Sequence, residues 1–90
     1  MKLKVGELYK WEPLNWEYAS SQTYTIFLGS RENIFSDGHH LLDKGGIVCV
    51  LEVALGDKFS VDYRVLTLDG VIGWVRISHS FLGDWVQISL

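Results

Sequence analysis

The amino-acid sequence predicts a small all-β barrel of about five antiparallel strands. Nearly every run of the chain has the pattern or composition of a β-strand, and residues 6–11 and 58–65 alternate apolar and polar side chains. These runs are separated by turn-forming pairs such as Asp69-Gly70, and no segment has the periodicity of a long helix. The chain has 90 residues, so we expect a single domain over residues 1–90.

The first predicted strand covers residues 6–11. Its alternation places Leu8 on one face and Tyr9 and Trp11 on the other, and Pro13 ends the run. A polar and aromatic loop over residues 12–22 follows.

Residues 23–28 have the β-branched and aromatic composition of a second strand. Residues 30–45 are predicted to form a long irregular loop, which is either functional or partly mobile. A single helical turn is expected at residues 31–34, and two turn signals lie in this loop, at Asp37-Gly38 and Gly45-Gly46.

The clearest core strand is predicted at residues 47–55, where both faces are largely apolar. Residues 58–68 form the next predicted strand, and one face of it carries Phe59, Val61, Tyr63 and Val65. At residues 65–68 both faces turn apolar.

A two-residue turn at Asp69-Gly70 predicts the register of the central hairpin. It pairs Leu66 with Gly73 and Val65 with Trp74, so Trp74 is expected on the side of Val61 and Tyr63. After this hairpin, residues 77–82 suit one 3₁₀ turn, and residues 84–88 form the last predicted strand.

Composition narrows the possible functions. The net charge is −3, and the 8 basic residues form no cluster, which argues against nonspecific nucleic-acid binding. No signal peptide or membrane-spanning run is evident, so we expect a cytoplasmic protein without a membrane partner. Cys49 is the single cysteine, which excludes an intramolecular disulfide, and its apolar neighbours predict a small buried side chain.

Several short motifs together resemble the SH3-like barrel. They are the opening Gly6-Glu7-Leu8, the Asp69-Gly70 hairpin, Gly73-Trp74-Val75, and residues 78–82 leading into residues 85–88. More narrowly, a strand opening Gly46-Ile47-Val48, the turn after Leu68 and the following Trp-Val look like small SH3-like proteins of tailed bacteriophages, marine ones especially. The likeness covers both ends of the chain and residues 46–88, but not residues 12–45.

The resemblance implies an SH3-like fold and, for a phage protein, a place in the host cytoplasm or the virion. It does not imply recognition of proline-rich peptides, because the first loop carries only Glu12 and Glu17 as acidic residues and no ALYDY-type segment is present. Fold alone does not decide function.

No motif predicts catalysis or a cofactor. Cys49 lies within an apolar strand, and Ser78-His79-Ser80 are too close in sequence to form a triad. His39 and His40, near Asp37 and Asp43, are weak candidate metal ligands, but a solvated loop explains them better and His79 is distant. We therefore expect a protein that is not an enzyme and holds no metal or cofactor.

The aromatic residues are the best candidates for a binding site. The resemblance implies that the loop of residues 12–22 flanks the turn near Phe81, so Trp16, Tyr18 and Phe81 are expected to line one groove. Trp74 is a fourth candidate, although a core position explains it better. The sequence thus favours a noncatalytic module that binds a protein partner or a copy of itself, as an accessory or structural component. The alternative is a nucleic-acid-binding SH3-like domain of the ribosomal or transcription-factor type.

Overall fold

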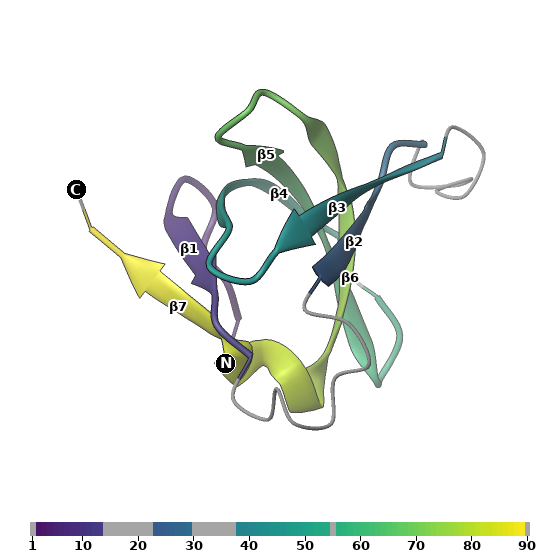
Figure 1. Ribbon diagram of the computed structural model, residues 1–90. Coiled ribbons are helices and arrows are strands. Elements are labelled where there is room, and N and C mark those ends of the chain that lie inside the picture. Colours follow the sequence, from purple (N-terminus) through teal and green to yellow (C-terminus); the bar gives the residue numbers. More distant parts are fainter. Residues whose placement is uncertain (1, 14–22, 30–37, 55, 90) are drawn as a thin grey trace.

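The computed structural model describes residues 2–13, 23–29, 38–54 and 56–89 (Figure 1). Within these ranges the chain forms seven strands and one 3₁₀ helix. In chain order they are β1 (Leu8–Trp11), β2 (Thr23–Phe27), β3 (His39–Asp43), β4 (Ile47–Ala54), β5 (Ser60–Thr67), β6 (Ile72–Ser78), η2 (His79–Asp84) and β7 (Trp85–Ile88).

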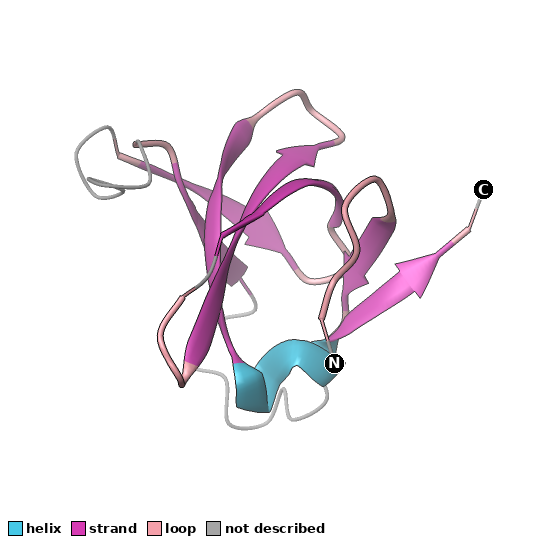
Figure 2. Cartoon of the chain, turned by 180° about the vertical axis from the view of Figure 1, so that it is seen from behind, coloured by secondary structure: helices cyan, strands magenta, loops and turns pink. Residues whose placement is uncertain are grey.

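The strands form one antiparallel sheet with the order β3-β2-β6-β5-β4-β1-β7. The sheet curls into a half-barrel, and η2 lies at one end of it between β6 and β7 (Figure 2). The all-β prediction and the 3₁₀ turn before the last strand are confirmed. The closed five-stranded barrel is not, because β3 and β7 end the sheet without pairing to each other.

Part of the predicted irregular loop is a strand. Residues 39–43 form β3, which pairs with β2 from Thr23↔Asp43 to Phe27↔His39. Only Leu42 of β3 is buried, so its sequence lacks the alternation that identifies a strand. The helical turn expected at residues 31–34 lies outside the described residues.

The predicted register of the central hairpin is wrong by one residue. The β5–β6 loop has three residues, in which the Gly70 amide donates to the Thr67 carbonyl (3.1 Å) and Gly70 has φ +88°. The Thr67 hydroxyl in turn accepts from the Val71 amide (3.0 Å) and donates to the Asp69 carboxylate, which stabilises this longer turn.

The shifted register reverses the face of every residue on β6. Val65 now pairs with Gly73, and Arg64 pairs with Trp74. Trp74 therefore lies on the face opposite Val61 and Tyr63, contrary to the prediction, because a slip of one residue turns each side chain to the other side.

The concave face of the sheet holds the hydrophobic core. Tyr9 and Trp11 share one face of β1, as predicted, and that face is the buried one. The core also contains Val48, Val50, Tyr63 and other side chains of β2, β4, β5 and β6. Phe59 was expected on this face, but it precedes β5 and is exposed. No helix in the described ranges has the length and apolar character needed to cross a membrane.

Candidate interaction surface

The structure describes two of the four predicted groove residues. Phe81 lies on η2 with 55% of its side chain exposed, whereas Trp74 lies on the convex face of β6 and is 8% exposed. Trp16 and Tyr18 lie outside the described residues, so their grouping with Phe81 stays a prediction.

Beside Trp74, the convex face carries an ion pair between buried Asp62 and exposed Arg76. Arg76 donates from Nε and a terminal guanidinium nitrogen to the two carboxylate oxygens of Asp62, at 2.8 and 3.1 Å. The hydrogen bonds and the charge of Asp62 raise the pKa of Arg76. The two charges thus match each other, with the two-point geometry of a strong ion pair.

A continuous row of apolar side chains crosses the convex face from strand to strand. Ile88 pairs with Leu8, Leu8 with Cys49, Cys49 with Leu66, and Leu66 with Ile72. Directly paired residues share one face of a sheet, so these five side chains stand side by side across β7, β1, β4, β5 and β6. We call this set the outer apolar row.

The outer apolar row is open to solvent and has a polar border. Ile72 is 46% exposed, the other four members are half-buried, and exposed Val86, Leu51 and Leu68 extend the row. The ion pair Lys10–Glu12 (3.0 Å) lies on one side of the row, and Arg64–Glu52 (4.0 Å) lies on the other. An apolar centre with a charged rim is the usual composition of a protein-binding surface.

Cys49 differs from its predicted environment. It was expected to be buried, yet it is half-buried on the convex face, while Val48 and Val50 fill the core. The sequence contained a signal of the outer apolar row, since residues 65–68 and 47–51 are apolar on both faces. The wrong hairpin register hid the row, because it paired Leu66 with Gly73 in place of Ile72.

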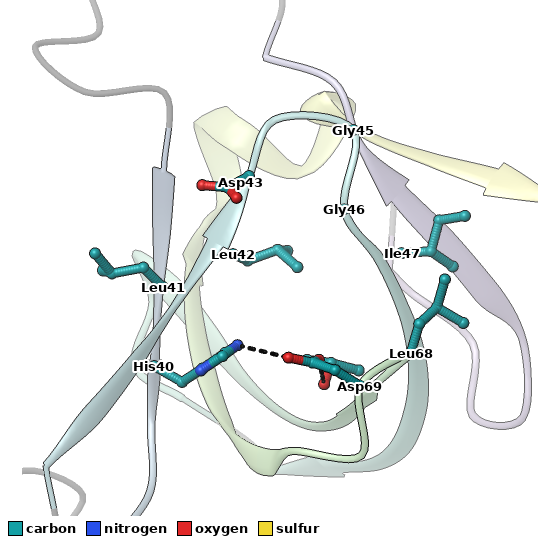
Figure 3. A pocket seen from close by; sticks show the side chains of 10 residues that line it. His40, Leu41, Leu42, Asp43, Gly45, Gly46, Ile47, Leu68 and Asp69 are labelled. Carbon is teal, nitrogen blue, oxygen red and sulfur yellow. Dashed lines mark hydrogen bonds and ion pairs between the residues drawn. The ribbon is translucent and has the colours of Figure 1, made fainter.

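A cavity of about 260 Å³ opens between β3, the β3–β4 turn and the β5–β6 turn (Figure 3). His40 points across it toward Asp69, with 3.5 Å between Nε2 and Oδ2. The Thr67 hydroxyl, the backbone amide of Asp69 and the neighbouring His40 hold the pKa of Asp69 below its usual value, with the hydroxyl the largest cause. The carboxylate is thus engaged in holding the turn.

The two candidate metal ligands do not converge. His39 and His40 are consecutive on β3, so their side chains point to opposite faces. Among the described residues, no group of three His, Cys, Asp or Glu side chains is placed to hold a metal ion. Asp37 lies outside the described residues.

Comparisons with known proteins found no match, so the function is inferred from the fold and its surface. No protein-family model matches the chain, and no match was found among curated proteins or among solved structures.

Proposed function

We propose that this protein is a noncatalytic interaction module that binds a protein surface, or another copy of itself, through the outer apolar row. The observation that carries the proposal is the unbroken row of partly exposed apolar side chains from Ile88 to Ile72 on the convex face of five adjacent strands. Covering such a row removes apolar surface from water, which is the main source of free energy in protein association.

The chemistry of the surface favours a protein partner over a nucleic acid. The outer apolar row is uncharged, and its flanking Lys10 and Arg64 are each paired with a carboxylate. Phosphate binding needs unpaired cations in a cluster, and the net charge of the whole chain is −3.

The resemblance to small SH3-like phage proteins supports a role as an accessory or structural component of a larger assembly. The half-barrel and the 3₁₀ helix before the last strand agree with that resemblance at the level of fold. A phage origin, and with it a location in the virion or the host cytoplasm, is part of this proposal.

Ile72→Lys tests the proposal directly. Ile72 is nearly half exposed, so a lysine there places a charge at the end of the outer apolar row without disturbing the core. Leu41→Lys is the matched control, because Leu41 is 50% exposed on β3, away from the row.

The measurement is quantitative cross-linking mass spectrometry on the full chain in its source cells, together with sedimentation velocity of the purified protein. We expect contacts, to other proteins or to a second copy, that are present in the wild type and in Leu41→Lys and are lost in Ile72→Lys. Contacts equal in all three proteins, or absent from all three, would contradict the proposal.

A further inference from the structure

The last strand lies at an edge of the sheet. Among the strands of the described residues, β7 pairs with β1 alone, and it extends away from the rest of the sheet in both views (Figures 1 and 2). An edge strand presents a row of free N–H and C=O groups that a further strand can pair with.

Hydrogen bonds to β1 identify which groups of β7 are free. The Glu12 amide donates to the Asp84 carbonyl (2.7 Å), so Asp84 and, by alternation, Val86 and Ile88 direct their backbone groups toward β1. Trp85, Gln87 and Ser89 therefore direct theirs to the open edge. The Trp85 amide is already used, since it donates to the Leu82 carbonyl at the end of η2.

We propose that the protein forms a symmetric dimer in which β7 pairs antiparallel with β7 of a second copy, on a twofold axis at Gln87. This inference goes beyond the proposed function, because the contact is the backbone edge of β7 and leaves the outer apolar row of each copy accessible to another partner. The register accounts for the free groups, because the two Gln87 residues exchange N–H···O bonds and each Ser89 amide donates to the Trp85 carbonyl opposite. This register does not need the Trp85 amide, which already donates to the Leu82 carbonyl in η2.

The side chains match in the same register. Val86 on one copy lies opposite Ile88 on the other, so the convex faces meet through apolar pairs and the outer apolar row of one copy continues into that of the next. Residues 85–89 contain no charged residue, proline or glycine, the usual features that protect an edge strand from pairing.

The other edge of the sheet lacks this match. β3 carries His39, His40 and Asp43, and His40 is directed at Asp69 beside the cavity (Figure 3). Polar and ionisable side chains on an edge strand oppose pairing with a second strand. The difference between the two edges assigns the dimer contact to β7.

Gln87→Pro is the first test. Proline removes the N–H at the centre of the proposed contact, and an edge strand tolerates proline where its amide faces solvent. Sedimentation velocity over a range of concentrations should show that the wild type and Leu41→Lys dimerise, and that Gln87→Pro weakens association by about tenfold or more. Thermal unfolding of the three proteins, measured alongside, reports whether the monomer fold is kept.

Disulfide trapping provides a second test that does not depend on proline, in a Cys49→Ser background. In this register the Cα atoms of the two Gln87 residues lie about 5.5 Å apart, whereas those of the two Ser89 residues lie about 14 Å apart. The two variants to compare are Gln87→Cys and Ser89→Cys. A disulfide needs less than about 7 Å, so only Gln87→Cys should form a covalent dimer on mild oxidation.

Three results would overturn the dimer. They are a wild type that stays monomeric at every concentration, a dimer that Gln87→Pro does not weaken although it folds, and equal trapping of Gln87→Cys and Ser89→Cys. If any of these occurs while Ile72→Lys still loses cross-links to another protein, the proposed function stands and only the β7 dimer fails.

Discussion

Gly73 on β6 lies so close to Ile26 on β2 that no side chain fits between the two strands. A Cβ atom on Gly73 would come within 2.5 Å of Ile26 Cγ2 and 2.7 Å of the Phe27 carbonyl oxygen. Among the described residues the ladder between β2 and β6 has the single pair Phe27↔Trp74, so this close approach helps to bring the β2–β3 hairpin against the rest of the sheet.

Gly73→Ala is therefore expected to destabilise the fold by about 1–3 kcal/mol, because the added methyl group must displace a backbone carbonyl as well as a side chain. Urea denaturation measures the free energy of unfolding. Ile72→Thr, a change at an exposed position of the same strand, should alter it by less than about 0.5 kcal/mol. Equal effects of the two substitutions would show that β2 does not approach β6 this closely.

Arg76→Ala is expected to cost about 1–3 kcal/mol of stability, because it leaves the buried Asp62 carboxylate without either hydrogen bond. The cost stays below that of a fully buried pair, since 48% of the Arg76 side chain is exposed and its charge is screened. Arg64→Ala breaks the exposed pair with Glu52 and should cost less than about 1 kcal/mol. Chemical denaturation of both variants gives the comparison, and a larger loss in Arg64→Ala would contradict it.

Acid should weaken the fold through Asp57. This carboxylate accepts hydrogen bonds from the amides of Phe59 (2.8 Å) and Ser60 (3.0 Å), which lower its pKa in the folded chain below 3.8. A lowered pKa contributes stability above pH 3.8, and that contribution is lost as the pH falls through the folded value. The urea midpoint should thus decrease below about pH 4, and Asp57→Asn, which cannot titrate, should make the decrease smaller. If the urea midpoint of Asp57→Asn depends on pH as that of the wild type does, Asp57 does not cause the loss of stability in acid.

Alkali should weaken the fold through Tyr24. Its ring packs edge-on against Trp11 and Trp85, at centroid distances of 5.4 and 5.2 Å, and its hydroxyl donates to the Arg76 carbonyl (2.5 Å). Burial, with a smaller effect of Asp84, raises the pKa of Tyr24 to about 12. The neutral phenol therefore contributes stability that is complete below pH 10 and is lost as the pH rises toward 12.

The check is absorbance titration of the phenolate together with unfolding at high pH. Tyr24→Phe should remove the part of the phenolate titration near pH 12 and part of the alkaline loss of stability. At neutral pH the same substitution should cost about 1 kcal/mol for the missing hydrogen bond. If Tyr24→Phe loses as much stability at high pH as the wild type does, a group other than Tyr24 causes that loss.

Local patterns were sufficient to predict most strands and their buried faces. Alternation placed Tyr9 and Trp11 together on one face of β1, which is the inner face in the structure, and it placed Val61, Tyr63 and Val65 on the inner face of β5. This works because the side chains of successive residues in a strand point to opposite sides, whatever the neighbouring strands are. The same reasoning found the 3₁₀ turn, where a short polar segment precedes the last strand.

The same local patterns could not predict the candidate interaction surface. The four predicted groove residues were chosen by their aromatic character, and the structure shows only Phe81 among them as an exposed side chain, with Trp16 and Tyr18 outside its described part. The outer apolar row depends on the pairing of five strands in register. One hydroxyl, that of Thr67, stabilises the three-residue turn that sets the register of two of them.

Alternation between near neighbours in the chain was thus enough to predict the all-β class and the strands with a clear apolar face. The pairing of β2 with β6, the pairing of Leu66 with Ile72 and the place of β7 at an edge of the described sheet are visible only in the folded chain. The first joins residues far apart in sequence, and the second depends on side-chain hydrogen bonds within a turn. Both are stabilised by packing that exists only once the sheet has formed.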